Sequence, residues 1–337
     1  MDNLSIITQL YEQMNQDEKD EFLKYLKGEK VKSSENHISI DLNLKIDKCP
    51  HCSSEKIVKN GHKDGIQRFK CKECGKTFTY TNNTILFSSK KDINTWIKFC
   101  ECLMNKFSIR KCAEICNINT HTAFNWRHKA LDALQNMQSE VHLKGVVEAD
   151  ETFFALSYKG NHKNFKLPRD SHKRGHSVSA RGLSKEMVCV PSIVNLDGMS
   201  IGRVSNLGKP SLKDLSKVID KRIEQGSIFV TDSFRAYNKV AFDNELTHIR
   251  ILKGKYTNGS FNIQTVNGYH SELKRLVIGN FKGVATKYLN NYIVYHNFVN
   301  FAKDGFTNKL SILTNFVFKT KCSTKGCDVV KRDAIPV

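Results

Sequence analysis

The sequence has no apolar run that approaches the ~20 residues needed to cross a membrane, which excludes a membrane-spanning protein. Its opening segment, MDNLSIITQLYEQMNQDEKDEF, has acids where a secretory signal has a basic region, and it lacks a long apolar stretch. At 337 residues the chain exceeds a typical single core. We therefore expect a cytoplasmic protein of two or three domains.

Acidic residues are also scarce over most of the chain. The total net charge is +19, and residues 48–337 carry 47 Lys or Arg against 24 Asp or Glu. Such a field attracts polyanions, and counterion release makes a phosphate backbone the natural partner. The charge favours nucleic-acid binding, although it would also suit a ribosomal or a membrane-surface protein.

Four of the eleven cysteines form two closely spaced pairs, Cys49-Pro-His-Cys52 and Cys71-Lys-Glu-Cys74, separated by 18 residues. This spacing is typical of a zinc ribbon, in which four thiolates complete a tetrahedron and the metal supplies the folding energy. His51 and His62 are rival ligands. We predict a structural Zn²⁺ in residues 48–80, which in turn indicates a reducing compartment. The remaining cysteines are interpreted as small core residues or weak metal signals.

Residues 108–131, SIRKCAEICNINTHTAFNWRHKAL, have the pattern of two helices about a polar turn, with Thr120 or Thr122 as the cap of the second helix. This pattern predicts a helix-turn-helix within residues 90–135, although an ordinary helical hairpin has the same pattern. The second helix of that motif enters the major groove. The predicted DNA contacts there are Thr120, His121, Asn125, Arg127, His128 and Lys129.

Two predicted strands carry acids. In VVEADETFFAL, alternation places Glu148 and Asp150 on one face and Glu151 on the other. Asp232 follows the apolar run of GSIFVTD, at the carboxyl end of a strand, where open α/β sheets bind ligands. Taken alone, each acid could be a cap or a turn residue.

A predicted helix, TVNGYHSELKRLVIGNF, adds polar residues to this set. Lys274 lies almost two turns beyond Asn267 and therefore shares its face, whereas Glu272 is about 140° away. Two divalent cations about 4 Å apart, held by hard oxygen ligands, can activate a nucleophile and stabilise a leaving oxygen in phosphodiester chemistry. Asp150, Asp232 and Asn267 are therefore predicted to bind two Mg²⁺ or Mn²⁺ ions.

The segments ADETFF, FVTDSFRAY and TVNGYHSELKRLVIGNFKGVATKYLNNYIVYHNFVNF resemble the three catalytic blocks of bacterial insertion-sequence transposases of the zinc-ribbon IS fifteen-ninety-five family. The resemblance implies a ribonuclease-H-like (retroviral-integrase-like) α/β catalytic domain in which Asp150 and Asp232 are the first two acids. The third family position lies seven residues ahead of Lys or Arg. Here it is Asn267, ahead of Lys274, as in the Asn-bearing branch.

The predicted domains follow from these segments. We expect a small helical N-terminal segment and linker (1–47), the ribbon (48–80), the helix-turn-helix region (90–135), the catalytic domain (144–303) and a C-terminal tail (304–337). The predicted order of three strands, helix, strand, helix, strand, helix agrees with a ribonuclease-H-like fold. A basic loop between Tyr158 and Lys185 is predicted to contact substrate phosphates through Lys173, Arg174 and Arg181.

The resulting hypothesis is a transposase that binds the inverted repeats of its element, cleaves a DNA strand and joins the released 3′-hydroxyl to target DNA. Pairing two DNA ends requires at least a homodimer on DNA, and the expected location is the nucleoid. The alternatives are a zinc-ribbon and helix-turn-helix DNA-binding regulator with a degenerate nuclease-like domain, which the neutral Asn267 keeps open, and a structure-specific nuclease.

Overall fold

The computed structural model divides the chain into two compact units, Met1–Asp41 and Leu42–Val337. It describes Lys19 and residues 46–63, 66–160, 187–300 and 306–335. The predicted N-terminal helices and most of their linker, and Lys173, Arg174 and Arg181 of the basic loop, lie outside the described residues. None of the described helices combines the length and the apolarity that a membrane crossing requires.

The cysteine-rich segment folds as a small three-stranded antiparallel sheet. Its strands, in the spatial order β1-β2-β3, are β1 Ile57–Lys63, β2 Ile66–Cys71 and β3 Thr77–Thr79. Phe69 stacks on Phe78 with ring centroids 5.9 Å apart, and the buried residues of this core are Cys49, Cys71 and Phe78. So few apolar residues cannot stabilise a sheet of this size without a further crosslink.

Three helices follow the sheet: α3 Ile93–Met104, α4 Ile109–Ile115 and α5 Thr120–Ser139. Ser108 caps α4, and the Asn119 side chain accepts a hydrogen bond of 2.8 Å from the amide of His121 at the start of α5. Asn119 therefore caps α5, in place of the predicted Thr120 or Thr122. The core of this region centres on Trp96 and Trp126, whose rings stack 3.6 Å apart.

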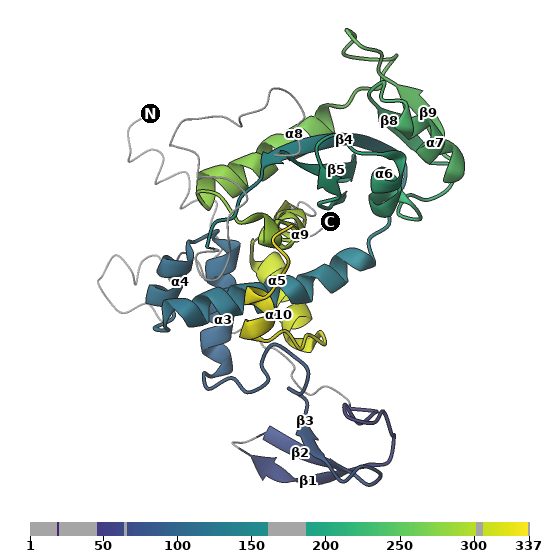
Figure 1. Cartoon of the computed structure of the whole chain (residues 1–337). Helices are drawn as coiled ribbons and strands as arrows, with labels where there is room; N and C mark the ends of the chain where they lie inside the picture. The colour runs from purple at the N-terminus through teal and green to yellow at the C-terminus, as the bar shows by residue number, and fades with distance from the viewer. Residues whose placement is uncertain (1–18, 20–45, 64–65, 161–186, 301–305, 336–337) are drawn as a thin grey trace. The chain divides into compact units, whose positions relative to one another are not determined.

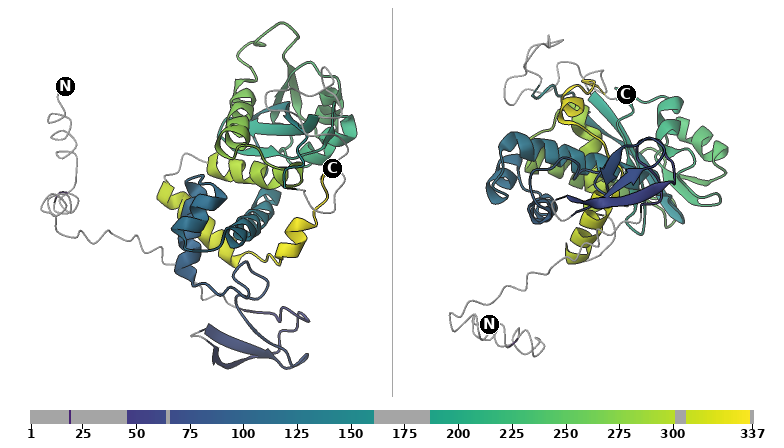
Figure 2. Two further views of the ribbon diagram at one scale, coloured as in Figure 1. Left: turned by 60° about the vertical axis from the view of Figure 1, so that its left-hand side comes forward. Right: turned by 90° about the horizontal axis from the view of Figure 1, so that it is seen from below.

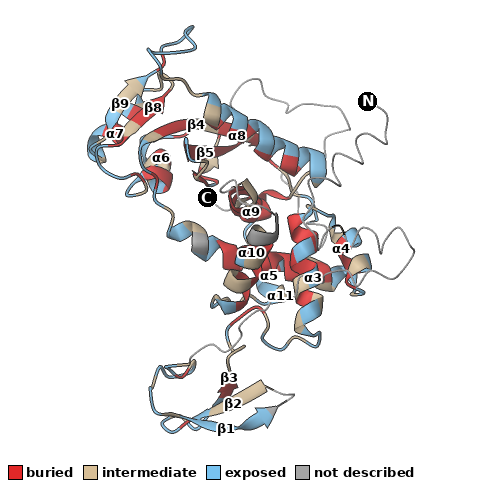
Figure 3. Ribbon diagram, turned by 180° about the vertical axis from the view of Figure 1, so that it is seen from behind, coloured by how far each residue is buried: buried red, intermediate tan, exposed pale blue. Residues whose placement is uncertain are grey.

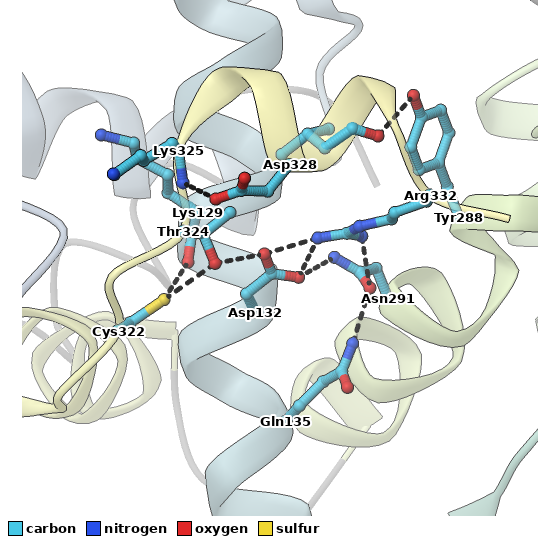
Figure 4. A network of polar contacts seen from close by, with 11 residues as sticks. Lys129, Asp132, Gln135, Tyr288, Asn291, Cys322, Thr324, Lys325, Asp328 and Arg332 are labelled. Atoms are coloured by element: carbon cyan, nitrogen blue, oxygen red, sulfur yellow. Dashed lines mark hydrogen bonds and ion pairs between the residues drawn. The ribbon is translucent and has the colours of Figure 1, made fainter.

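The predicted C-terminal tail contains two helices, α10 Phe306–Lys319 and α11 Gly326–Val330. Phe318 packs its ring edge against Trp96, and Arg332 forms an ion pair of 2.6 Å with Asp132 of α5. Asn291 and Thr324 complete the contacts of that carboxylate, as Figure 4 shows. The last part of the chain thus belongs to the helical core and is not a tail.

The remaining residues form an α/β layer structure around one sheet. Its strands are β4 Val146–Ala155, β5 Met187–Asn195, β6 Ser200–Gly202, β7 Asn206–Leu207, β8 Ile228–Thr231 and β9 Thr247–Arg250. The spatial order is β6-β5-β4-β8-β9, with β7 paired to β5. The β4–β5 and β5–β6 pairs are antiparallel, whereas β4–β8 and β8–β9 are parallel.

Helices cover both faces of this sheet. The helices, in chain order, are α6 Leu212–Ile219, α7 Ala236–Asp243, α8 Gln264–Lys274 with a π-helical extension Arg275–Asn280, and α9 Leu289–Asn300 after a 3₁₀ turn Thr286–Tyr288. One apolar cluster joins α6 and α7 to Val147, Ala149 and Phe229. On the other face α8 lies along β4 (Figure 1, Figure 2), and its outward residues are exposed (Figure 3).

A glycine allows the helices to approach the second face closely. A Cβ atom added at Gly202 of β6 would lie 2.9 Å from the Tyr269 hydroxyl of α8 and 3.2 Å from Ile293 of α9. A larger residue would therefore require the Tyr269 hydroxyl to move. Gly202 thus allows Tyr269 of α8, the helix that carries the predicted third ligand, to pack directly on β6.

Candidate functional site

The register of two neighbouring strands brings Asp150 and Asp232 together. In the parallel β4–β8 pair the last partners are Ala149 and Thr231, so that the next residues on the two strands are Asp150 and Asp232. Val147, Ala149 and Phe229 face α6 and α7. Alternation therefore turns both aspartates to the opposite face, toward α8, at the point where β8 ends.

A buried glutamate fixes helix α8 over this face. The Glu148 carboxylate accepts hydrogen bonds from the Val266 amide (2.9 Å) and the Thr265 hydroxyl (2.8 Å), both in the first turn of α8. The first turn of a helix has unpaired amides and a positive dipole end, so a carboxylate stabilises it. Glu148, which shares its face with Asp150 as predicted, is thus an anchor for the helix.

The side of α8 nearest to Asp150 carries His270 and Lys274. The His270 Nδ1 atom lies 3.8 Å from the Asp150 carboxylate, and the Lys274 charge lowers the pKa of Asp150. Asn267 is exposed and lies almost two turns before Lys274 on the same side of the helix. The side of α8 that carries Asn267, His270 and Lys274 is therefore the side that faces Asp150.

Several acidic side chains gather at this edge of the sheet, and Lys274 offsets only part of their charge. Burial, together with the neighbouring Asp232 charge, raises the pKa of Asp150 to about 6. Burial also raises the pKa of Glu151 to about 7, with contributions from Asp150 and Asp232. Oxygen ligands with excess negative charge are what a divalent cation requires, so the residues present fit such an ion.

Glu151 is a neighbour of the site that the strand pattern alone does not reveal. It lies on the α7 face, as alternation predicts, and accepts a hydrogen bond of 2.6 Å from the buried Tyr237 hydroxyl. Since α7 follows Asp232 closely in sequence, Tyr237 links the two acidic strands. Glu272, the other carboxylate of α8, accepts a hydrogen bond of 2.9 Å from Asn300 of α9, on the other flank of the helix.

The four predicted zinc ligands lie together. Their sulfur atoms are all within 4.8 Å of one another, and the Cys49–Cys74 and Cys52–Cys71 pairs are 3.7 and 3.6 Å apart. Sulfurs bound to one zinc at about 2.3 Å in a tetrahedron are about 3.8 Å apart, so the donor set fits this metal. The Cys74 amide donates to the Cys71 sulfur and lowers the pKa of that thiol to about 6. His51 and His62 are not part of this group.

Helix α5 contains both exposed and buried members of the predicted DNA-contact set. Thr120 and His121 are exposed, and Asn125 and Lys129 are half-buried. Arg127 and His128 are only 2% and 1% exposed, which corrects the prediction that they lie on the outer surface of the helix.

The side chains of Arg127 and His128 are held inside the helical core. The Arg127 guanidinium donates to the Phe107 carbonyl and to the Cys112 sulfur. The His128 ring packs between Phe124 and Tyr288, with centroids 4.6 and 4.2 Å away. Neither side chain can reach the edge of a base pair from this position without rearrangement of the core.

Comparison with known proteins agrees with this arrangement. Residues 142–298, which contain both aspartates and α8, match the ISXO2-like transposase domain family. This segment is therefore similar to the transposase domains of that family. The resemblance seen in the sequence motifs is thereby confirmed.

Two individual proteins are also similar to the chain. An uncharacterized protein in transposable element ISH50 of Halobacterium salinarum is 26% identical over 249 residues, which are 73% of this chain and 82% of that protein. The match therefore extends beyond the transposase domain. The crystal structure of a pre-cleavage Mos1 transpososome aligns over 64% of this chain and 75% of that chain at 8% identity, but its TM-score of 0.23 supports no structural conclusion.

Proposed function

We propose that the chain is a DNA transposase that cleaves the ends of its element and transfers them to target DNA. The observation that carries this proposal is that Asp150 and Asp232 directly follow Ala149 and Thr231, the last paired residues of two adjacent parallel strands, under the helix face that bears Asn267 and Lys274. The strand order β6-β5-β4-β8-β9, antiparallel on one side of β4 and parallel on the other, supports a ribonuclease-H-like fold.

Each residue of the site has a distinct role in this proposal. Asp150, Asp232 and Asn267 hold two Mg²⁺ or Mn²⁺ ions, which would activate the attacking hydroxyl and stabilise the leaving oxygen. Lys274 contacts a phosphate or base at the element end. Glu148 holds the start of α8 and thereby positions Asn267 relative to the aspartates.

The N-terminal elements serve DNA recognition in this proposal. The ribbon (48–80) binds structural Zn²⁺, and the helix-turn-helix (90–135) contacts the inverted repeats through Thr120, His121, Asn125 and Lys129. The catalytic domain spans 144–303, and the basic loop supplies Lys173, Arg174 and Arg181. Two copies pair the two ends, so that a DNA-bound complex would elute at the mass of a dimer or higher. Such a protein acts on the nucleoid.

Cleavage and strand transfer of DNA that ends in the inverted repeats of the element test this function. The purified full chain is expected to cut and join such DNA only with added Mg²⁺ or Mn²⁺. Asp150→Asn and Asp232→Asn are expected to abolish both steps while DNA binding remains. Asp243→Asn, which alters an exposed ion pair with Lys239, is the matched control. Full activity of either site variant would sink the assignment.

A second function is kept open by the neutral amide at position 267. A DNA-binding regulator with a degenerate nuclease-like domain would bind the repeats but cut nothing. Asn267→Glu separates the two proposals, because restoring a third carboxylate changes Mg²⁺ affinity and cleavage in an enzyme. A regulator would remain inactive in both forms, and a structure-specific nuclease would cut without strand transfer.

A further inference from the structure

A cavity lies away from the acidic site, where the first turns of α4 and α5 meet the segment between α8 and α9. It has a volume of about 470 Å³, within the ~300–1,000 Å³ of small-ligand pockets. Its described lining includes Arg127, Lys159, Lys282 and Lys287 but no Asp or Glu. An anionic ligand is therefore favoured on charge alone.

The wall of the cavity is aromatic. Phe124 and Tyr288 lie with their ring centroids 5.7 Å apart, and His128 contacts both rings. Burial lowers the pKa of His128 to about 3, so this imidazole is neutral. Its Nδ1 atom is buried and has no hydrogen-bond partner among the described residues. The wall thus offers flat π surfaces and one polar atom that can still form a hydrogen bond.

Arg127 gives the inner part of the cavity its positive charge. The guanidinium is buried, and the described residues provide it with a carbonyl, a sulfur and the Phe281 ring at 5.2 Å, but no carboxylate. A buried cation without a counter-ion is costly, and an anion bound nearby would reduce that cost.

The mouth of the cavity is formed by a turn with unusual backbone geometry. Lys282 has φ 55° and Gly283 has φ 88°, and the Lys159 ammonium donates to both of their carbonyls at 3.0 and 2.9 Å. The left-handed region disfavours a lysine. The Lys282 side chain is exposed here, on the side where His121 of α5 also lines the cavity.

An aromatic wall with a cationic rim matches a nucleotide, whose base has a π face and whose phosphate is negative. Resting on the proposed function, we propose that this cavity binds one unpaired nucleotide of the DNA substrate. The base packs against Phe124 and Tyr288, and its phosphate lies at Lys282. A base within a duplex cannot present its face in this way, since both faces are stacked.

Photocrosslinking tests the location. The full chain, without added Mg²⁺ so that no DNA is cut, is mixed with a short single-stranded oligothymidylate that carries one 5-iodouracil. Irradiation is expected to join the base to peptides that contain Phe124 or Tyr288. Crosslinks that fall only on other peptides would overturn the proposal. Because no cleavage is measured, a failure here is distinct from a failure of the transposase assay.

Affinity measurements test the proposed base contact and the proposed phosphate contact separately. Phe124→Leu is expected to weaken binding of the same oligonucleotide by roughly 5- to 150-fold, the range of one base-aromatic stack. Lys282→Ala is expected to weaken binding about threefold or more through the lost phosphate contact. Lys221→Ala, an exposed lysine with φ 62°, is the matched control and should bind as the wild type does.

Two results would contradict the proposal. Equal affinity of the Lys282→Ala and Lys221→Ala proteins would exclude this cavity as the phosphate site. Equal affinity for an oligonucleotide of the same length in which every residue is abasic would show that only the backbone is bound. Thermal unfolding of the Phe124→Leu protein shows whether it is folded. If it is not, the affinity of the Lys282→Ala protein tests the proposal, because Lys282 is exposed.

Discussion

The cysteine ribbon and the acidic site, which we propose to bind metal, are assembled in opposite ways. The four ribbon ligands come from residues 49–74, and two short turns place all four sulfurs within 4.8 Å. The acidic site joins Asp150, Asp232 and the Asn267 helix through sheet register and one buried glutamate. A local site needs its metal in order to fold, whereas a site on a large core can exist as a scaffold before the metal binds.

The largest expected effect is therefore loss of the ribbon. Cys52→Ala should release Zn²⁺ and unfold residues 48–80, because structural zinc contributes about 10–16 kcal/mol to such modules. The catalytic sheet should stay folded. Zinc content and limited proteolysis measure the two outcomes, and Cys327→Ala, an exposed cysteine elsewhere, is the control. Resistance of residues 48–80 to proteolysis in the absence of zinc would contradict the expectation that the ribbon needs its metal in order to fold.

The acidic site should instead be destabilising when it is metal-free. Because the pKa of Asp150 in the folded protein is about 6, above its ordinary 3.8, the folded state binds this proton more tightly. The contribution of Asp150 to folding stability is then lost as the pH rises between these two values. The contribution of Glu151 is lost up to about pH 7.

Asp150→Asn removes the ionisable carboxyl and with it this loss of folding stability. At pH 8 without divalent cations the variant should be more stable than the wild type by up to roughly 3 kcal/mol. Added Mg²⁺ should stabilise the wild type and leave the variant unchanged. Chemical unfolding at pH 4 and pH 8 measures both effects. A stability difference between wild type and Asp150→Asn that stays the same at pH 4 and pH 8 would contradict the pKa shift of Asp150.

Loss of the helix anchor should have a smaller effect. Glu148→Ala leaves the Val266 amide without its acceptor and should cost about 1.5–3 kcal/mol of folding free energy, the range for hydrogen bonds to charged groups. The start of α8 should then exchange its amide hydrogens faster. Hydrogen exchange of residues 264–270 checks this, and Glu114→Ala, an exposed glutamate of α4, should leave these amides unaffected.

The smallest expected effect concerns the third ligand. Asn267→Ala removes one neutral oxygen and should weaken Mg²⁺ binding about tenfold, the lower end for loss of a group that tunes a metal site. Glu272→Ala, on the other flank of the same helix, should bind Mg²⁺ as the wild type does. Calorimetric titration compares them. A larger loss in Glu272→Ala would mean that the helix phase assigned to the site is wrong.

The contrast also explains what the sequence could predict. The spacing alone predicts that the four ribbon cysteines lie together, as they do, and the 2- and 3.6-residue periods predict the face shared by Glu148 and Asp150 and the helix side shared by Asn267 and Lys274. Periodicity cannot show that Glu148 caps α8, because its partners are about 118 residues away and depend on tertiary packing.

Long-range packing also explains the incorrect predictions. Arg127 and His128 are polar residues on a helix, and a sequence pattern gives such residues to solvent. Their burial depends on Phe281 and Tyr288, which come from the other end of the catalytic segment. The helices after residue 304 were missed for a similar reason, since their apolar positions fit into a core formed by Trp96 and Trp126.

The ion pair between Asp132 and Arg332 spans 200 residues of sequence. Synthesis proceeds from the N-terminus, so α5 leaves the ribosome long before Arg332 and Phe318 are made. The helical region that contains Trp96 can therefore complete its packing only after the catalytic sheet has been synthesised. In a protein built this way, a newly made chain can finish packing α3 and α5 only when the strands that carry Asp150 and Asp232 have already been made.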